Sequence, residues 1–225
     1  LGISTIDTAD NYGVVCDILA KLDISEFTII SKVDYSASNS DKAEVQISKA
    51  IINFSSAKEL SILIHNPEVA LSTGTELTDL IKFLDKQRKR TKIGISIYTP
   101  AHLEGMIENG INCDIVQLPM CPGDSRWDAI FANREPHFRS FFRNTEIHVR
   151  SIFFQGLLVR RDLADKVKDR RFREVLNKWW CYVDENNVHP VAACLKTVIA
   201  KIPEAFLVVG INQLTELKTL AEQSA

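Results

Sequence analysis

The chain has 225 residues, of which 45% are hydrophobic and 25% are charged, so it is long enough to bury a substantial core in one domain. A formal net charge of -2 and a pI of about 6.2 give no electrostatic reason to expect binding to nucleic acid or to a membrane. No apolar run approaches the roughly 20 residues that span a bilayer, and the first residues do not resemble a secretion signal, so we expect a cytoplasmic protein. Composition does not decide between a monomer and a homo-oligomer.

The five cysteines are odd in number, widely spaced and without any CxxC pairing, which favours neither a disulfide framework nor a zinc site. We expect reduced, mostly buried thiols and no bound metal. The cysteines are Cys16, Cys113, Cys121, Cys181 and Cys194.

Short apolar runs alternate with longer amphipathic ones, which predicts an α/β fold with a parallel sheet and crossover helices. The seven predicted strands are Ile3–Ile6, Phe27–Ser31, Leu60–Ile64, Lys92–Ser96, Asp114–Leu118, Ile147–Phe153 and Phe206–Val209. The predicted helices begin at Val14, cover Lys42–Phe54 and Leu77–Leu84, run from Thr99-Pro100 to Asn109-Gly110, and cover Val191–Ile202 and Leu214–Ala221. We expect one domain over residues 1–225.

Two stretches between these elements allow more than one interpretation. The charge-dense stretch Lys166–Arg173 is predicted to be a solvated helix face, and the alternative is a lid that offers cations to a phosphorylated ligand. The aromatic cluster of Trp179, Trp180 and Tyr182 is interpreted first as packing and second as a substrate wall.

Polar residues recur where the predicted strands end, and the carboxyl ends of parallel strands in a barrel meet on the face that carries the active site. These residues are Asp7, Ser31, Lys32, His65, Ser96, Gln117, Arg150, Ser151, Gln155, Gly156 and Gly210. A doubly wound sheet would also gather strand ends, but the first loop lacks the GxGxxG fingerprint expected there. We therefore predict a barrel of parallel strands.

Four residues form a chemically coherent set. Tyr12 donates a proton at neutral pH only weakly unless its anion is stabilised, and a nearby Lys32 would lower the pKa of the phenol. Asp7 would pair with Lys32, and His65 would orient a carbonyl oxygen beside Tyr12. Each residue alone has an ordinary structural interpretation, as a turn, surface or core residue, but their joint order and spacing favour catalysis.

The sequence resembles the aldo-keto reductase superfamily over nearly its whole length. The similar segments are GISTIDTA (2–9) with Tyr12-Gly13, Ser31-Lys32-Val33, LIHNP (63–67), KIGIS (92–96), VQLP (116–119) and QGLL (155–158). The run 148–156 is closer to bacterial-type members associated with polysaccharide or nucleotide-sugar genes, which suggests carbohydrate metabolism.

The resemblance implies a (β/α)8 TIM barrel that binds NADP or NAD without a Rossmann motif. It implies that Tyr12 is the general acid, that Lys32 and Asp7 tune it, and that His65 orients the carbonyl. It implies that Ser96 and Gln117 hold the nicotinamide carboxamide. Further cofactor-binding residues are Arg150, Ser151, Gln155 and Gly156, together with Gly210, Ile211, Asn212 and Gln213 at the start of the last helix, where anions bind.

The sequence departs from the family pattern in four places. Arg150 stands where an aromatic residue often stacks on the nicotinamide, and Ile97 replaces a common Asn. Glu216 stands where NADP-dependent members carry Arg, so NAD is an alternative to NADP. The first strand and helix of the family are not among these 225 residues, so the strand at 3–6 and the last strand would have unpaired edges.

Three hypotheses follow. The first is an NAD(P)-dependent oxidoreductase that interconverts a carbonyl, including that of a sugar derivative, and an alcohol, with Tyr12 as general acid/base. The second is a non-catalytic, truncated dinucleotide-binding or scaffold protein. The third is an unrelated barrel lyase or isomerase that uses a metal or Lys32 as a Schiff base.

Overall fold

The structure is a computed structural model that describes residues 2–34, 40–66, 68, 82–83, 91–133 and 136–223. The helix predicted over 77–84 lies outside the described residues, except for Lys82 and Phe83.

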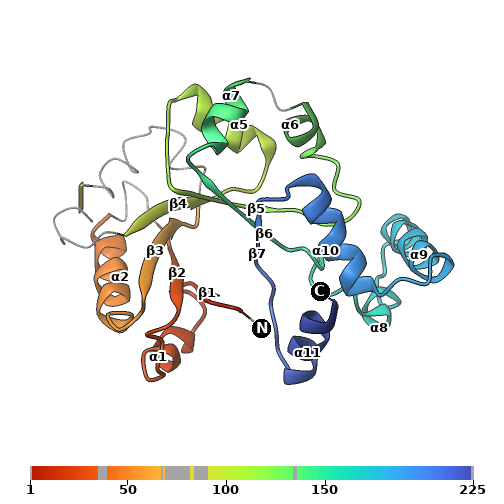
Figure 1. The fold of residues 1–225 in the computed structure, drawn as a ribbon, viewed down its shortest axis with the longest axis horizontal. Helices are drawn as coiled ribbons and strands as arrows, with labels where there is room; N and C mark the ends of the chain where they lie inside the picture. The colour runs from red at the N-terminus through yellow and green to blue at the C-terminus, as the bar shows by residue number, and fades with distance from the viewer. Residues whose placement is uncertain are drawn as a thin grey trace. The chain divides into compact units, whose positions relative to one another are not determined.

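Seven parallel strands are hydrogen-bonded in chain order from β1 to β7 (Figure 1). The strands are β1 Thr5–Asp7, β2 Thr28–Val33, β3 Glu59–Ile64, β4 Lys92–Ser96, β5 Ile115–Pro119, β6 Glu146–Arg150 and β7 Phe206–Leu207. All seven predicted strands are therefore present, with ends shifted by up to a few residues.

Helices alternate with these strands, as the sequence pattern predicts. The described helices are α1 Val15–Leu19, α2 Ser40–Asn53, α5 Pro100–Glu108, α6 Asp128–Asn133, α7 Pro136–Phe142, α8 Arg161–Ala164, α9 Arg170–Glu185, α10 Pro190–Lys201 and α11 Leu214–Gln223. A sequential parallel strand order with helices between strands is the pattern of a (β/α)8 barrel, and the described residues supply seven of its strands. The predicted fold class is confirmed.

Close contacts divide the chain into two compact units. The first unit comprises Leu1–Leu118 and Arg134–Ile147, and the second comprises Pro119–Asn133 and His148–Ala225. The prediction of one domain over residues 1–225 stays a prediction.

In the first unit, β2 and β3 are buried on both faces, as expected for parallel strands covered by helices. Five consecutive residues are buried in β2, and five in β3. Ile30, Leu63 and Ile115 pack together in the core. Figure 1 shows α1 and α2 beside β1, β2 and β3.

The inward face of α2 differs from the apolar pattern in the sequence, where Val45, Ile47, Ile51 and Ile52 stand out. Ile47 is fully buried, but Val45 is 68% exposed and Ile52 is 71% exposed. The buried residues are Ala43, Ile47, Ala50 and Phe54, which recur every three or four positions. Two alanines therefore complete the buried face, because their small side chains let the helix approach the sheet.

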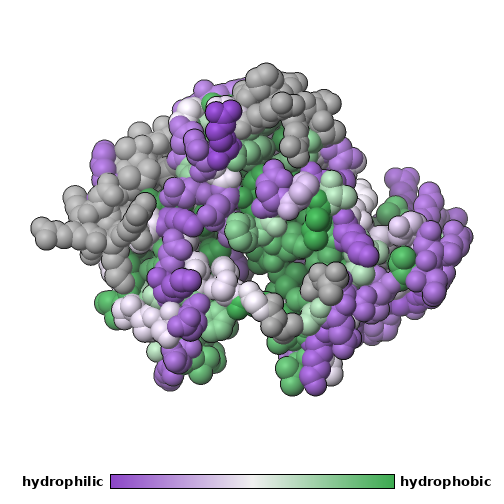
Figure 2. Space-filling model, in the orientation of Figure 1, coloured by the Kyte–Doolittle hydropathy of each residue, from purple (hydrophilic) through white to green (hydrophobic). Residues whose placement is uncertain are grey.

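The outer side of α1 exposes several large apolar side chains next to an edge strand. Val14, Val15, Ile18 and Leu22 are all exposed, and Figure 2 shows hydrophobic residues gathered there, at the lower left. The strand order places β1 and β7 at its two ends, as the sequence predicts.

In the second unit, α10 packs against α6 and α11. Trp127, just before α6, is fully buried, and so are Cys194 and Val198 of α10. The strand β6 ends at Arg150, so the predicted extension to Phe153 is wrong. The physical reason is that Ser151 has a φ of 62°, a left-handed conformation that a strand does not accommodate.

The charged stretch Lys166–Arg173 is only partly helical, which corrects the sequence interpretation. Asp169 accepts a hydrogen bond of 2.7 Å from the Phe172 amide and so caps α9, which begins at Arg170. Among the described residues, no helix has the length and apolar character needed to cross a membrane.

Candidate active site

The end of β1 lies beside β2 in a register that brings Asp7 and Lys32 together. The Thr8 amide donates to the Ile30 carbonyl over 2.8 Å, and the Asp10 amide donates to the Lys32 carbonyl over 3.2 Å. Lys32 is 3% exposed, and its Nζ forms an ion pair and hydrogen bond with Asp7 Oδ1. A buried ammonium requires such a counter-charge, so Asp7 keeps Lys32 charged in place.

The second oxygen of Asp7 is held from the opposite part of the sheet. Gln117 in β5 donates from Nε2 to Asp7 Oδ2 over 2.9 Å. In the strand order, β5 is four strands away from β1. A direct bond between their side chains requires this part of the sheet to curve around a shared interior, as in a barrel.

Tyr12 is positioned by the loop that follows β1. Its amide donates to the Ala9 carbonyl over 3.1 Å, and Gly13 continues the chain with a φ of 67°. The Lys32 Nζ lies 5.8 Å from the centroid of the Tyr12 ring. Tyr12 is 49% exposed, so its phenol is accessible while its ring lies near a buried cation.

His65 directly follows β3, and its amide donates to the Val33 carbonyl over 2.9 Å. Its Nδ1 lies 3.9 Å from Asp34 Oδ1. Asp34 was not singled out in the sequence, although its position directly after β2 was a usable signal. The structure thus brings Asp7, Tyr12 and Lys32 together and ties His65 to the end of β2.

Ser96 and Gln117 are register partners in β4 and β5, and both are fully buried. Ser96 Oγ and Gln117 Oε1 have no hydrogen-bond partner in the part of the chain that the structure describes. Buried polar atoms are normally paired, so these two oxygens are suited to a polar group of a ligand. An amide group fits them, because the serine hydroxyl can donate or accept and the glutamine oxygen accepts.

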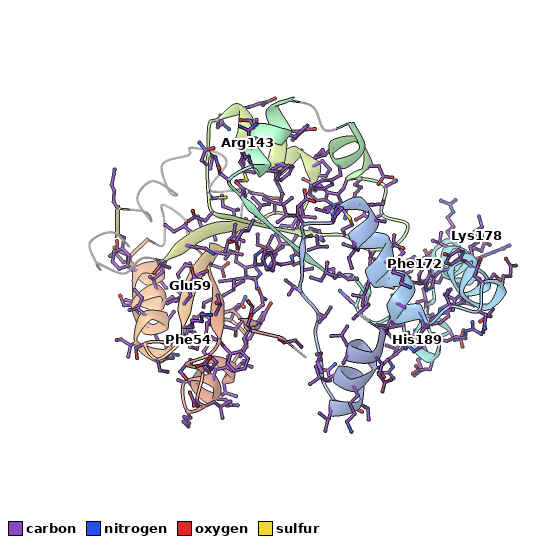
Figure 3. The ribbon with its side chains drawn as sticks, in the orientation of Figure 1. Phe54, Glu59, Arg143, Phe172, Lys178 and His189 are labelled. Carbon is purple, nitrogen blue, oxygen red and sulfur yellow. The ribbon has the colours of Figure 1, made fainter. Side chains whose placement is uncertain are left out.

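The second unit contains a pocket of about 680 Å³. Six of the eight residues that were predicted to bind the cofactor in this unit line it: Ser151, Gln155, Gly156, Gly210, Ile211 and Asn212. Arg150 and Gln213 were also predicted but do not line it. Lining residues that sequence reasoning missed include Arg160, His189, Thr215 and Thr219. His189, labelled in Figure 3, precedes α10, and its Nδ1 accepts from the Val191 amide over 3.3 Å.

One wall of this pocket has an unusual backbone. Ser151, Phe154 and Gln155 have φ values of 62°, 46° and 55°, and Gly156 follows with 87°. Arg150 donates from Nη1 to Ser151 Oγ over 3.4 Å. Left-handed residues other than glycine are costly and cluster at ligand sites, so this segment is a candidate for ligand contact.

The start of α11 forms another wall of the pocket, and the Glu216 carboxylate accepts hydrogen bonds from two backbone amides there. Glu216 Oε2 accepts from the Asn212 amide over 2.7 Å and from the Gln213 amide over 3.3 Å. This is the geometry of a capping box, in which an acidic residue in the first turn reaches back to the amides before the helix. The amides at 212 and 213 are therefore engaged by a carboxylate of the chain itself.

Arg160 adds a cation to the pocket wall. It donates to Asp162 from Nε over 3.2 Å and from Nη2 over 2.9 Å. The bonded Asp162 carboxylate raises the pKa of Arg160, and Glu216 contributes to the same increase. In the described part of the chain, no group of three or more His, Cys, Asp or Glu residues is arranged to hold a metal ion.

No family model matches the sequence, and no curated protein matches it. Solved structures match the fold. A putative aldo-keto reductase from Pseudomonas aeruginosa is 16% identical with a TM-score of 0.66, over 100% of this chain and 75% of that one. The holo form of aldo-keto reductase AKR11C1 from Bacillus halodurans is 18% identical with a TM-score of 0.69, over 99% and 76%. An aldo-keto reductase from Brucella melitensis is 15% identical with a TM-score of 0.60, over 99% and 79%.

The fold and the strand-end residues define a class of protein. It is the class of α/β barrels that carry polar side chains at the carboxyl ends of their strands. Within that class, the chain has the aldo-keto reductase fold, and it covers about three quarters of the length of these solved structures. The resemblance seen in the sequence is confirmed at the level of the fold.

Proposed function

We propose that the protein is a nicotinamide-dependent oxidoreductase that interconverts a carbonyl and an alcohol, with Tyr12 as the general acid. One observation carries the proposal: an accessible phenol lies 5.8 Å, measured from its ring centroid, from an ammonium that is almost completely buried and paired with Asp7. A buried ammonium beside an exposed phenol can stabilise the phenolate that forms when the phenol gives up its proton. The same ammonium contributes little to packing.

A bound nicotinamide supplies the hydride. Tyr12 donates its hydroxyl proton to the carbonyl oxygen as negative charge develops there. The Lys32 ammonium stabilises the phenolate that remains, because an opposite charge nearby favours the ionised form. Asp7 holds the ammonium, and Gln117 holds Asp7 in turn.

His65 is proposed to orient the substrate carbonyl. The carboxylate of Asp34 lies 3.9 Å from its Nδ1.

Two sets of residues, each within one unit, are proposed as cofactor contacts. Ser96 Oγ and Gln117 Oε1 would hold the nicotinamide carboxamide. Both oxygens are buried, and neither has a hydrogen-bond partner among the described residues. Separately, the pocket of the second unit is proposed as a site for dinucleotide phosphates, which the left-handed segment 151–156 would contact.

We propose that NAD is preferred over NADP. Glu216 places a carboxylate in the pocket and uses the two amides that would otherwise attract an anion. A carboxylate accepts hydrogen bonds from ribose hydroxyls but repels a 2'-phosphate. The association of the run 148–156 with sugar chemistry makes sugar-derived carbonyls the first substrates to test.

The test is turnover of NADH and NADPH with a panel of aldehydes, ketones and sugar carbonyls, using wild type, Tyr12→Phe and Tyr182→Phe. Loss of the general acid is expected to lower kcat/KM about 10²- to 10⁴-fold. Tyr182→Phe, which removes a hydroxyl from the exposed side of α9, is expected to keep wild-type turnover. Wild-type turnover in Tyr12→Phe would refute the assigned acid, and tight dinucleotide binding without any turnover would favour a non-catalytic protein.

A further inference from the structure

Helix α9 is fixed against its own unit by one face. Leu176 and Val183 are buried, and Trp179 donates from Nε1 to the Leu158 carbonyl over 2.9 Å. Arg161, which precedes this helix in the chain, lies 4.7 Å from the Trp180 ring centroid and donates a hydrogen bond of 2.7 Å to Asp184. These contacts set the rotation of the helix and so decide which of its residues remain at the surface.

A flank of the helix beside this buried face carries an apolar stripe, which consists of the exposed Val175 and Tyr182 and the partly buried Trp179. Val175 is 59% exposed and Tyr182 is 50% exposed. The half-buried Trp179 ring stacks on Tyr182 with centroids 5.9 Å apart. Residues seven positions apart lie two turns apart on the same side of a helix, so the stripe is continuous. Figure 2 shows hydrophobic residues among the hydrophilic ones over this helix, at the right.

The charges beside the stripe are arranged against the helix dipole. The first turn has no acidic residue, the last turn has no basic residue, and the exposed Arg171 and Glu185 lie near the two ends. Cations near a helix N-terminus and carboxylates near its C-terminus destabilise an isolated helix. Within the described residues, neither Arg171 nor Glu185 forms an ion pair, unlike Arg170, which bonds Glu174 over 3.1 Å.

We propose that the stripe of α9 pairs in antiparallel orientation with the α9 stripe of a second copy of this chain. A two-fold axis between positions 178 and 179 places Val175 opposite the partner's Tyr182. It also places Arg171 close to the partner's Glu185 and Lys178 against the partner's Trp179. Every contact occurs twice, as two-fold symmetry requires. Figure 3 shows Lys178 on the outer side of α9, as this pairing needs.

The composition of the face favours a copy of the chain over other occupants. An anionic membrane selects a cationic polar face, whereas this face carries both Arg171 and Glu185 beside the stripe. Antiparallel pairing puts Arg171 of one copy next to Glu185 of the other, and the reverse. Each charge then offsets the unfavourable interaction of its partner with the helix dipole. One helix of about 24 Å buries less than the roughly 800 Å² per partner of a standard interface, so the dimer is expected to be weak and concentration-dependent.

The test is sedimentation velocity over a wide range of protein concentration, with a reductant present because Cys181 on α9 is exposed. Wild type is expected to shift from monomer to dimer with an apparent Kd in the micromolar range. Arg171→Glu and Glu185→Arg are each expected to weaken the dimer at least about tenfold, and the double variant is expected to restore it. Lys196→Glu, a similar charge change at an exposed position of α10, serves as the control and is expected to leave the Kd unchanged.

Far-UV circular dichroism of each variant separates unfolding from lost association. A monomer at all concentrations would overturn the proposal. So would a dimer that both single variants leave intact, because the contact would then lie elsewhere. A double variant as weak as the single ones would overturn the proposed register.

Discussion

Lys32 has the most demanding environment of the candidate catalytic residues, because its ammonium is buried and Asp7 carries the opposing charge. We predict that Asp7→Asn lowers the free energy of unfolding by about 3 kcal/mol, since it leaves a buried cation without its counter-ion. Urea unfolding of both proteins measures the difference. An unchanged midpoint would show that the ion pair does not stabilise the fold.

The double variant Asp7→Asn/Lys32→Met separates the charge from the packing. Removing both partners of a buried ion pair is often nearly neutral, so most of the lost stability is expected to return. A double variant that is less stable than Asp7→Asn would mean that the lysine stem and ammonium contribute independently of Asp7.

Glu216 makes cofactor preference testable at a single residue. We predict that Glu216→Gln raises the affinity for NADPH relative to NADH about tenfold, which corresponds to ~1.4 kcal/mol, because it removes the charge that repels a 2'-phosphate. Glutamine retains the capping-box hydrogen bonds to the amides at 212 and 213, so α11 stays in place.

Isothermal titration calorimetry with each dinucleotide gives this ratio directly. Glu204→Gln removes the same charge from an exposed position before β7 and is expected to leave the ratio unchanged. An equal change in the two variants would point to overall charge rather than to a local contact.

For individual residues, the sequence predicted a role correctly where that role depends on the residue's position in its own strand. Asp7 ends β1 and Lys32 is the last residue but one of the neighbouring β2, so their proximity follows from strand order. The bond from Gln117 to Asp7 was not predictable, because it joins residues 110 positions apart across a curved sheet. The same holds for Arg160 and His189, which reach the pocket from segments outside the predicted strand ends.

Among the elements, the pairing of β4 with β5 depends on a glycine. A Cβ at Gly94 would lie 2.3 Å from the carbonyl oxygen of its register partner Ile115, which is closer than atoms tolerate. We predict that Gly94→Ala lowers the free energy of unfolding by about 1–3 kcal/mol, because the two strands must separate.

Thermal unfolding measures this effect, with a fall in Tm of about 2–4 °C for each kcal/mol in a protein of this size. Gly105→Ala is the matched control, because a Cβ at this position in α5 meets no atom within 4 Å and alanine favours a helix. The explanation would be wrong if both variants melted at the wild-type temperature.

Element ends were harder to predict than element types. The helix α5 begins at Pro100 as the Thr99-Pro100 pair predicts, since proline at the first helical position is a local signal. The end of β6 is set instead by the left-handed backbone at Ser151, which hydrophobicity does not reveal. The inward face of α2 was misjudged because alanine was not counted as a core residue.

For the molecule as a whole, the order of strands and helices was readable from hydrophobic periodicity, because each parallel strand needs a crossover helix and both leave clear patterns. The fold is recognisable in solved structures that share only 15–18% of their residues with this chain. The surface of α9 that is proposed to pair could not be predicted from hydrophobic periodicity, because it depends on which side of an amphipathic helix faces its own unit.

The most direct test of the proposed function is the transfer of label from the cofactor to the product. NADH deuterated at the ring carbon that donates hydride is mixed with an accepted carbonyl substrate, and the alcohol is analysed by mass spectrometry and NMR. We predict deuterium at the former carbonyl carbon with wild type, and at least about 100-fold slower labelling with Tyr12→Phe. An alcohol without deuterium, or equal labelling rates in the two proteins, would contradict the assignment of Tyr12, Lys32 and Asp7 as a carbonyl-reducing site.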